Sequence, residues 1–290
     1  MILKNQLIKK LKKMMLDNLT IHTPAKINLF LKVLSKRDDG YHNIRTGVTF
    51  IDLFDKIEIK RSKKTIINYS GPFKPENGFY KDCIIYKIIN SLKLENKINL
   101  QIDIQKNIPV QGGLGSASSN AAGFIEALKK MNLIKIKDFE FYAFLGADIP
   151  SFLFKKNCLV TGMGEKIFKY NFPQYYFLLV KPNCNLSTKD MYKKLKIKKV
   201  SFDDLDLQHN EVNDDDMGND FEEIIKNESP EINELLNFLS RIQDTIFTRM
   251  TGTGSCCYAV FENEYQAKKG QEYFNSYFPN LWNYLAKNSI

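Results

Sequence analysis

The stretch that decides how this chain folds is a glycine- and serine-rich run, Pro109-Val110-Gln111-Gly112-Gly113-Leu114-Gly115-Ser116-Ala117-Ser118-Ser119-Asn120. An alternating apolar segment precedes the run and a segment with helical spacing follows it, so it should join a strand to a helix that starts within residues 118–120. Its glycines let backbone N–H groups approach an anion closely, and the helix amino terminus directs its partial positive charge at the same anion. The run therefore predicts a phosphate-binding loop, although a serine-capped tight turn has a similar composition.

This loop differs from two common phosphate-binding patterns. It lacks the Gly-Lys-Ser/Thr ending of the P-loop, and it does not fit the Gly-x-Gly-x-x-Gly fingerprint of dinucleotide-binding folds. The hydroxyl groups of Ser116, Ser118 and Ser119 add hydrogen-bond donors and offer oxygen atoms to Mg²⁺.

A second glycine-rich turn lies near the other end of the chain. Glycine alternates with hydroxyl residues in Arg249-Met250-Thr251-Gly252-Thr253-Gly254-Ser255, just before an apolar segment. We expect Gly252 and Gly254 to line the other side of the phosphates or to support the first loop.

Phosphoryl transfer to an alcohol needs a group that accepts the alcohol's proton, and one carboxylate is suitably placed. Asp148 lies among apolar residues, where burying it is costly unless it has a partner. Lys26 and Asn28, two residues apart, share one face of an expected strand. If Lys26 meets Asp148, its ammonium keeps the carboxylate ionised and helps to orient the hydroxyl. The simpler interpretations are a helix cap for Asp148 and an edge-strand lysine for Lys26.

The order of the expected elements indicates an α+β protein with two lobes. The 290 residues, 43% of them hydrophobic and 26% charged, have the composition of a globular protein. Strands are expected at residues 22–33, 46–59, 98–104, 175–180 and 256–261. Helices are expected at residues 82–92, 118–131, 138–144, 187–195, 221–225, 231–238 and 265–278. We expect a dispensable extension, an ATP-binding domain and a second domain at residues 1–19, 20–163 and 164–290.

The net charge of +9 does not identify a partner. It suits nucleic acid, an anionic membrane surface or a phosphorylated substrate. No apolar run approaches the roughly 18 residues that span a bilayer, so we do not expect an integral membrane protein. Five cysteines, an odd number without paired metal spacing, indicate reduced thiols in a cytoplasmic protein. Ten acidic and no basic residues at 203–223 indicate a solvated loop rather than a metal site.

In chain order, four segments resemble the motifs of the GHMP kinase superfamily: residues 24–28, 113–122, 146–150 and 249–255. One branch of the superfamily phosphorylates a cytidine-diphosphate-linked sugar alcohol, and its members have an Asp-Gly-Tyr-His stretch. This chain has a similar stretch, Asp38-Asp39-Gly40-Tyr41-His42-Asn43-Ile44-Arg45-Thr46. The resemblance covers residues 20–261, nearly all of the expected folded part.

The resemblance implies a fold and an activity. The fold is the two-lobed GHMP kinase fold, with an amino-terminal lobe like domain 2 of ribosomal protein S5 and a ferredoxin-like carboxy-terminal lobe. The activity is transfer of phosphate from ATP, with Mg²⁺, to the 2-hydroxyl of cytidine diphosphate methylerythritol in the non-mevalonate isoprenoid precursor pathway. The implied partner is this small molecule, with no nucleic acid and no membrane, for a cytoplasmic monomer or weak homodimer.

The resemblance also implies roles for single residues. Asp148 is the catalytic base and Lys26 its partner, and Asn28 lies close to the accepting hydroxyl. The phosphates of ATP are held by Pro109, Gly112, Gly113, Leu114, Gly115, Ser116, Ala117, Ser118, Ser119 and Asn120.

Four further residues are implied in substrate binding. Tyr41 stacks on the cytosine and His42 forms a hydrogen bond with its edge. Thr188 binds the substrate, and Tyr192, four residues later, closes an aromatic sandwich over the base. Two aromatic faces hold a pyrimidine without regard to its identity, and hydrogen bonds to its edge then supply selectivity.

The chain departs from the family pattern at several positions. Gln111, Ser116 and Ala117 replace glycines of the usual loop, and Cys83 stands where an asparagine is expected near the adenine pocket. Two other functions stay open: another small-molecule kinase of the superfamily, acting on a mevalonate-type substrate, homoserine or a sugar, and a catalytically silent RNA-binding protein. A kinase for another alcohol has no need of the Tyr41, His42 and Tyr192 set.

Overall fold

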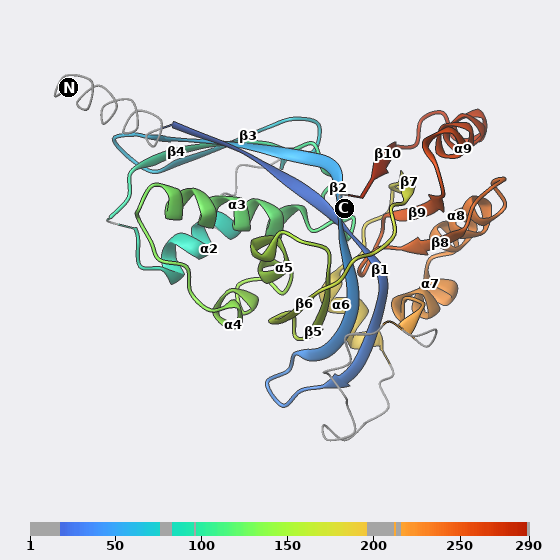
Figure 1. Ribbon diagram of the computed structural model, residues 1–290, viewed down its shortest axis with the longest axis horizontal. Coiled ribbons are helices and arrows are strands. Elements are labelled where there is room, and N and C mark those ends of the chain that lie inside the picture. Colours follow the sequence, from blue (N-terminus) through green and yellow to red (C-terminus); the bar gives the residue numbers. More distant parts are fainter. Residues whose placement is uncertain (1–17, 76–82, 96, 196–211, 213–215, 289–290) are drawn as a thin grey trace.

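The computed structural model describes residues 18–75, 83–95, 97–195, 212 and 216–288. Two sheets, each with helices packed on it, form the molecule (Figure 1). The six-stranded sheet contains β1 (Asn18–Lys36), β2 (His42–Arg61), β3 (Ile66–Ser70), β4 (Leu100–Gln105), β5 (Cys158–Gly162) and β6 (Lys166–Lys169). Its order is β3-β4-β2-β5-β6, and β1 pairs along β2. No helix in the described ranges is long and apolar enough to cross a membrane.

The β1–β2 hairpin arches through the whole molecule and connects the two lobes (Figure 1). Both strands are longer than predicted, because their polar ends also pair and only residues 37–41 remain for the turn. His42 is therefore the first residue of β2. Pro24, which cannot donate a ladder hydrogen bond, lies at a register shift of β1, where a missing donor is tolerated.

Helices α2 (Ile84–Ser91), α3 (Ser116–Lys130), α4 (Phe139–Ala143) and α5 (Ile149–Phe154) lie on one face of the six-stranded sheet (Figure 1). A core of isoleucines from β2 and β4 packs against Phe124 and Leu128 of α3. The predicted start of α3 within residues 118–120 is wrong: Gly115, with φ of 71°, is the cap, and the helix begins at Ser116. Gly115 can adopt this left-handed backbone conformation because it has no side chain, so the loop ends at Gly115. A helix capped by a serine would have begun about two residues later, at Ser118.

The four-stranded antiparallel sheet forms the second lobe. It contains β7 (Tyr176–Val180), β8 (Phe247–Met250), β9 (Cys257–Phe261) and β10 (Asn283–Lys287) in the order β10-β7-β9-β8. Helices α8 (Pro230–Ser240) and α9 (Glu264–Tyr277) cover one face (Figure 1). Side chains of β7 and β9, such as Leu179 and Tyr258, meet Ile27 and Ile51 of the long hairpin in a common core. The predicted α+β architecture with two lobes is confirmed.

Two predictions about the connections need comment. The predicted boundary between the two domains lies between residues 163 and 164, which is inside the hairpin formed by β5 and β6. Because this hairpin belongs to one sheet, a boundary after Lys169 fits the strand pairing better. The division into these domains stays a prediction. The acidic stretch is not a solvated loop at its end, because Asp216 is buried against Arg45 and residues from Phe221 form α7 (Phe221–Glu228). Residues 1–17, 203–211 and 213–215 lie outside the described part of the chain.

Candidate active site

A cavity of about 810 Å³ lies between the two glycine-rich turns. Lys26, Asn28, Asp148, Thr188 and Tyr192 line it, and so do most of the residues predicted to hold phosphate: Pro109, Gly112, Gly113, Leu114, Gly115, Ser116, Ala117, Ser118 and Asn120. The structure therefore brings both glycine-rich turns and the candidate base to one place, although they come from distant parts of the chain.

Hydrogen bonds join the two glycine-rich turns directly. The Cys256 N–H donates to the carbonyl of Gly112 at 3.2 Å, and Thr251 Oγ1 donates to the carbonyl of Gly113 at 3.2 Å. Thr251 Oγ1 also accepts the N–H of Asn28 at 3.0 Å. Gly113 has a φ of +70°, and a Cβ there would lie 2.0 Å from the carbonyl oxygen of Thr251, so no side chain fits. Thr251 and Cys256 thus tie the second turn to the first, and the supporting role expected of Gly252 and Gly254 stays a prediction.

Asn219, which was not predicted from the sequence, fixes the second glycine-rich turn through hydrogen bonds. Asn219 Nδ2 donates to the carbonyl oxygens of Met250 and Gly252, at 2.7 and 2.8 Å. The N–H of Gly254 closes the turn on the carbonyl of Thr251 at 3.0 Å. Because Asn219 is buried and fixes two carbonyl groups, it sets the position of the turn relative to β1.

The amino terminus of α3 is the natural place for phosphate. The first turn of a helix leaves its N–H groups without helical partners, and no side chain caps α3. The three predicted serine hydroxyls differ, however. Ser116 Oγ donates to Asp55 Oδ2 at 2.9 Å, and Ser119 Oγ donates to the carbonyl of Pro24 at 2.6 Å. Ser118, which lines the cavity, is therefore the hydroxyl best placed to meet a ligand.

Lys26 and Asp148 meet in the cavity. Lys26 Nζ lies 3.7 Å from Asp148 Oδ2 and forms a hydrogen bond with Asn28 Oδ1. Lys26 is 3% exposed, so it is not an edge-strand solubility residue. Burial lowers the pKa of Lys26, and the Asp148 carboxylate raises it in partial compensation. Asp148 precedes α5 but its side chain makes no capping bond, so the carboxylate, 40% exposed, faces a partner and the cavity instead.

A second cavity, of about 980 Å³, continues from the first one toward the β1–β2 turn. Ile44, Ala147, Thr188 and Tyr192 line both cavities, so the two meet next to Asp148. The second cavity adds the predicted substrate residues Tyr41 and His42. Thr188 Oγ1 lies 2.9 Å from Thr253 Oγ1, which ties the start of α6 (Thr188–Lys194) to the second glycine-rich turn.

Two rings of the second cavity, His42 and Tyr192, are stacked on each other, and Tyr41 contacts a different ring. Tyr192 lies parallel to His42, with ring centroids 4.8 Å apart and 26° between the planes, and edge-on to Phe221 at 4.9 Å. Tyr41, 42% exposed, packs edge-on against Phe144 at 5.9 Å. The ring that covers Tyr192 is thus His42, whereas the implied sandwich places Tyr41 opposite Tyr192; that sandwich stays a prediction for the substrate complex.

Sequence reasoning also missed a buried ion pair below the phosphate loop. Asp55 is fully buried and Lys106 is 4% exposed, and Lys106 Nζ forms a salt bridge with Asp55 Oδ2. A pattern in the sequence marks this carboxylate: Leu53, Asp55 and Ile57 alternate along β2, so Asp55 shares the face of buried apolar residues. A charge on such a face requires a partner.

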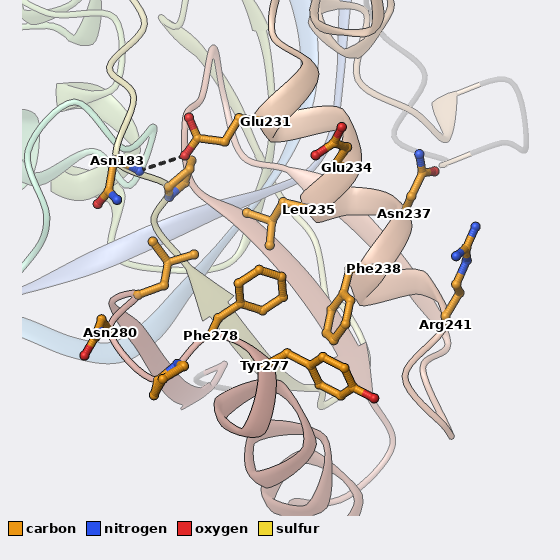
Figure 2. A pocket seen from close by; sticks show the side chains of 13 residues that line it. Asn183, Glu231, Glu234, Leu235, Asn237, Phe238, Arg241, Tyr277, Phe278 and Asn280 are labelled. Carbon is orange, nitrogen blue, oxygen red and sulfur yellow. Dashed lines mark hydrogen bonds between the residues drawn. The ribbon is translucent and has the colours of Figure 1, made fainter.

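A cavity of about 700 Å³ on the outer side of the second lobe contains none of the predicted site residues. Figure 2 shows Phe238, Tyr277 and Phe278 around it, with Glu231 and Arg241 on the rim. The N–H of Asn183 donates to Glu231 at 3.2 Å. The residues suited to phosphoryl transfer therefore lie in the cleft between the glycine-rich turns.

Comparison with known proteins gives consistent results. The family descriptions "GHMP kinases N terminal domain" and "GHMP kinases C terminal" match residues 83–156 and 203–280. Proteins named 4-diphosphocytidyl-2-C-methyl-D-erythritol kinase from Francisella tularensis subsp. tularensis (strain SCHU S4 / Schu 4) and Francisella philomiragia subsp. philomiragia are 38% and 36% identical over 245 residues, which is 81% of this chain and 85% of theirs. A crystal structure of 4-(cytidine 5'-diphospho)-2C-methyl-D-erythritol kinase matches 94% of this chain and 100% of its own with a TM-score of 0.73 at 21% identity, which shows the fold.

Proposed function

The chain belongs to the family of 4-diphosphocytidyl-2-C-methyl-D-erythritol kinases, and we propose from this premise how its cleft transfers phosphate from ATP to the 2-hydroxyl of 4-diphosphocytidyl-2-C-methyl-D-erythritol. The enzyme is an ATP-dependent kinase of the isoprenoid pathway. One observation carries the proposal for its site: the phosphate-loop cavity and the aromatic cavity meet beside Asp148, which is where a phosphate donor and an alcohol acceptor have to meet.

The nucleotide binds in the first cavity. Its phosphates accept hydrogen bonds from the free N–H groups at the start of α3 and from the Ser118 hydroxyl, in the field of the helix dipole. Gly113 keeps the loop close to the phosphates because it adopts a φ that residues with a side chain rarely adopt.

The alcohol binds in the second cavity. Tyr41, Tyr192 and His42 offer two aromatic faces and a ring nitrogen to the cytosine, and Thr188 offers a hydroxyl. Burial lowers the pKa of His42, and the positive charge of Lys36 lowers it further. The imidazole is therefore neutral near pH 7, and a neutral imidazole both donates and accepts hydrogen bonds at a base edge.

Asp148 then removes the proton from the acceptor. The hydroxyl oxygen forms its bond to the γ-phosphorus as the bond from that phosphorus to ADP breaks, and the hydroxyl proton moves to Asp148. Lys26 holds the Asp148 carboxylate at 3.7 Å, and Asn28 holds Lys26 through its Oδ1. A buried ammonium next to the carboxylate fixes the direction in which the carboxylate faces the acceptor.

Mg²⁺ is part of the same proposal. Among the described residues, no group of three or more His, Cys, Asp or Glu side chains could hold a metal ion, so the ion would enter with the nucleotide. The Ser118 hydroxyl fits this mode because it places an oxygen donor in the same cavity as the phosphate-binding turn. Bound Mg²⁺ would neutralise charge on the phosphates. Family membership also underlies our proposal of a cytoplasmic enzyme, a monomer or weak homodimer, that acts without nucleic acid or membrane.

An assay of ADP release tests the function. The enzyme is supplied with Mg-ATP and, in separate reactions, with 4-diphosphocytidyl-2-C-methyl-D-erythritol, mevalonate, homoserine and galactose. We expect turnover with the cytidine compound alone. Turnover with another alcohol would contradict the roles of Tyr41, His42 and Tyr192 but not those of the phosphate loop. Folded protein that turns over none of them, but binds RNA with a steep dependence on salt, would favour the RNA-binding alternative.

A further inference from the structure

The ion pair below the phosphate loop is more completely bonded than a single salt bridge requires. Lys106 Nζ contacts Asp55 Oδ2 and Ser116 Oγ, and it donates to Asn120 Oδ1 at 2.7 Å. Burying two charges has a large desolvation penalty, and an apolar pair of the same size is often as stable. Stability alone therefore does not explain why two charged residues occupy this place.

The connections of Asp55 show what the pair holds together. Asp55 Oδ1 accepts the N–H groups of Asn107 and Ile108, at 2.7 and 2.9 Å, where β4 gives way to the loop. Asp55 Oδ2 accepts Ser116 Oγ at 2.9 Å and Asn120 Nδ2 at 3.0 Å, in the first two turns of α3. One carboxylate of β2 thus fixes the entrance and the exit of the loop at the same time.

Ser116 connects this pair to the nucleotide cavity. Its backbone N–H belongs to the free first turn of α3, and its hydroxyl is bonded below to Asp55 and Lys106. Lys106 and Ser116 also line the cavity itself.

We propose that Asp55 and Lys106 are a positioning pair for the nucleotide, which they hold indirectly by fixing the first turn of α3 through Ser116. The proposal rests on the proposed function only in placing nucleotide phosphates at this turn. Burial lowers the pKa of Lys106 while Asp55 raises it, in agreement with an ammonium that depends on its carboxylate partner. The pair acts on nucleotide affinity and leaves the acceptor site untouched.

The first test is Ser116→Ala, which removes the hydroxyl and keeps the helix. We expect the Kd for Mg-ATP, measured by calorimetry without any alcohol, to rise about 3- to 10-fold, because the first turn of α3 loses its hydroxyl bonds to Asp55 and Lys106. The KM for the alcohol should stay within about twofold of its normal value, because no contact to that cavity is removed. Wild-type affinity for Mg-ATP in Ser116→Ala would overturn the proposed connection.

Thr49→Val is the matched control. Thr49 is fully buried in β2, and its Oγ1 donates to Asn157 Oδ1 at 3.0 Å, away from both glycine-rich turns. The variant also loses a buried hydroxyl bond, so we expect a decrease in melting temperature but a Kd for Mg-ATP within about twofold of wild type. An equal loss of nucleotide affinity in both variants would show a general effect of destabilisation and would contradict the proposal.

The pair itself is tested with both charges removed together. A single substitution leaves the other charge buried and unpaired, so it is prone to unfold. The double variant Asp55→Asn/Lys106→Met keeps an oxygen for the Asn107 and Ile108 N–H groups. We expect a folded protein, as judged by circular dichroism, whose Kd for Mg-ATP rises about 10-fold or more while kcat at saturating nucleotide falls less than about threefold.

Wild-type Mg-ATP affinity in the folded double variant would show that the pair only stabilises the fold. If the double variant does not fold, the comparison of Ser116→Ala with Thr49→Val decides the question by itself. Because the Kd for Mg-ATP is measured without alcohol, an error in the proposed acceptor leaves this readout intact. A wild-type chain that binds no Mg-ATP would instead contradict the proposed function.

Discussion

The phosphate-loop end of the cleft and its aromatic end are held by different kinds of contact. At the first end, hydrogen bonds from backbone and buried side chains fix the loop, as in the bond from Thr251 Oγ1 to Gly113. At the aromatic end, rings lie against rings, and Tyr41 and Phe144 are 42% and 50% exposed. Directional bonds to buried partners allow one geometry, whereas ring contacts at the surface allow several.

This difference fits the two ligands. ATP presents the same phosphates in every cycle, so a rigid site loses little entropy on binding it. The acceptor has to enter between rings, and His42 already lies on Tyr192 where a base would stack. We therefore expect substitutions at the phosphate end to act through backbone geometry, and those at the aromatic end to act through lost ring area.

The largest effect should come from Asp148, where the two ends meet. Asp148→Asn keeps the shape but removes the base, so kcat should fall about 10²- to 10⁴-fold while the Kd for Mg-ATP changes little. Steady-state kinetics and calorimetry give the two values. Asp138→Asn, an exposed carboxylate before α4, should keep normal kcat and serves as the control. A normal kcat in Asp148→Asn would show that Asp148 is not the base.

Gly113→Ala should have the next largest effect. The added Cβ would lie 2.0 Å from the Thr251 carbonyl at a φ of +70°, so the turns have to separate. Strain of this kind costs about 1–3 kcal/mol, and kcat/KM for ATP should fall at least about 10-fold. Gly112→Ala should lose much less, because its Cβ would meet Cys256 Cβ at an ordinary 3.5 Å. Equal losses in the two variants would contradict the rigidity assigned to this end.

At the aromatic end, Tyr192→Ala should weaken the alcohol and not the nucleotide. Stacking of an aromatic residue on a base contributes about 1–3 kcal/mol, so the KM for the alcohol should rise at least about 5-fold. Tyr192→Phe keeps the ring and should lose far less. A matching rise in the Kd for Mg-ATP in Tyr192→Ala would show that the two ends are not independent.

The phosphate end was easier to predict from sequence than the aromatic end. The glycine-rich turns and the isolated Asp148 are local patterns, and their meeting place followed from the family resemblance. The position of His42 on Tyr192 depends on how β2 and α6 approach each other, which no local pattern records. The start of α3 was misplaced because Gly115, and not a serine, caps the helix.

Contacts between distant residues account for most of what was missed. Asp55 and Lys106 are 51 positions apart, and only the packing of β2 against the end of β4 brings them together. The short strands β5 and β6 were not predicted, because glycines interrupt the apolar pattern around their turn, and their pairing depends on contacts of β5 with β2 and of β6 with β5. All five cysteines are free: Cys158, Cys256 and Cys257 are buried, whereas Cys83 and Cys184 are half-buried.

The smallest predicted effect concerns pH at the aromatic end. Burial and the charge of Lys36 lower the pKa of His42 below the usual value of about 6.5. The folded protein thus binds this proton less tightly than the unfolded chain. The contribution of His42 to stability is complete above about pH 6.5, and it is lost as the pH falls through the lowered pKa. Protonation also removes the acceptor nitrogen from the base edge, so substrate binding should weaken in the same range.

Kinetics from about pH 5 to pH 8 check this for the wild type, His42→Gln and the control His22→Gln. We expect the wild-type KM for the alcohol to be constant near pH 7 and to rise about 2- to 10-fold at the acid end, as for one lost hydrogen bond. His42→Gln should have a raised KM without this rise, whereas His22→Gln, on β1, should follow the wild type. If the KM for the alcohol of His42→Gln still rises at low pH as in the wild type, the titrating group is not His42. The cytosine would then be held by ring contacts without a hydrogen bond from His42.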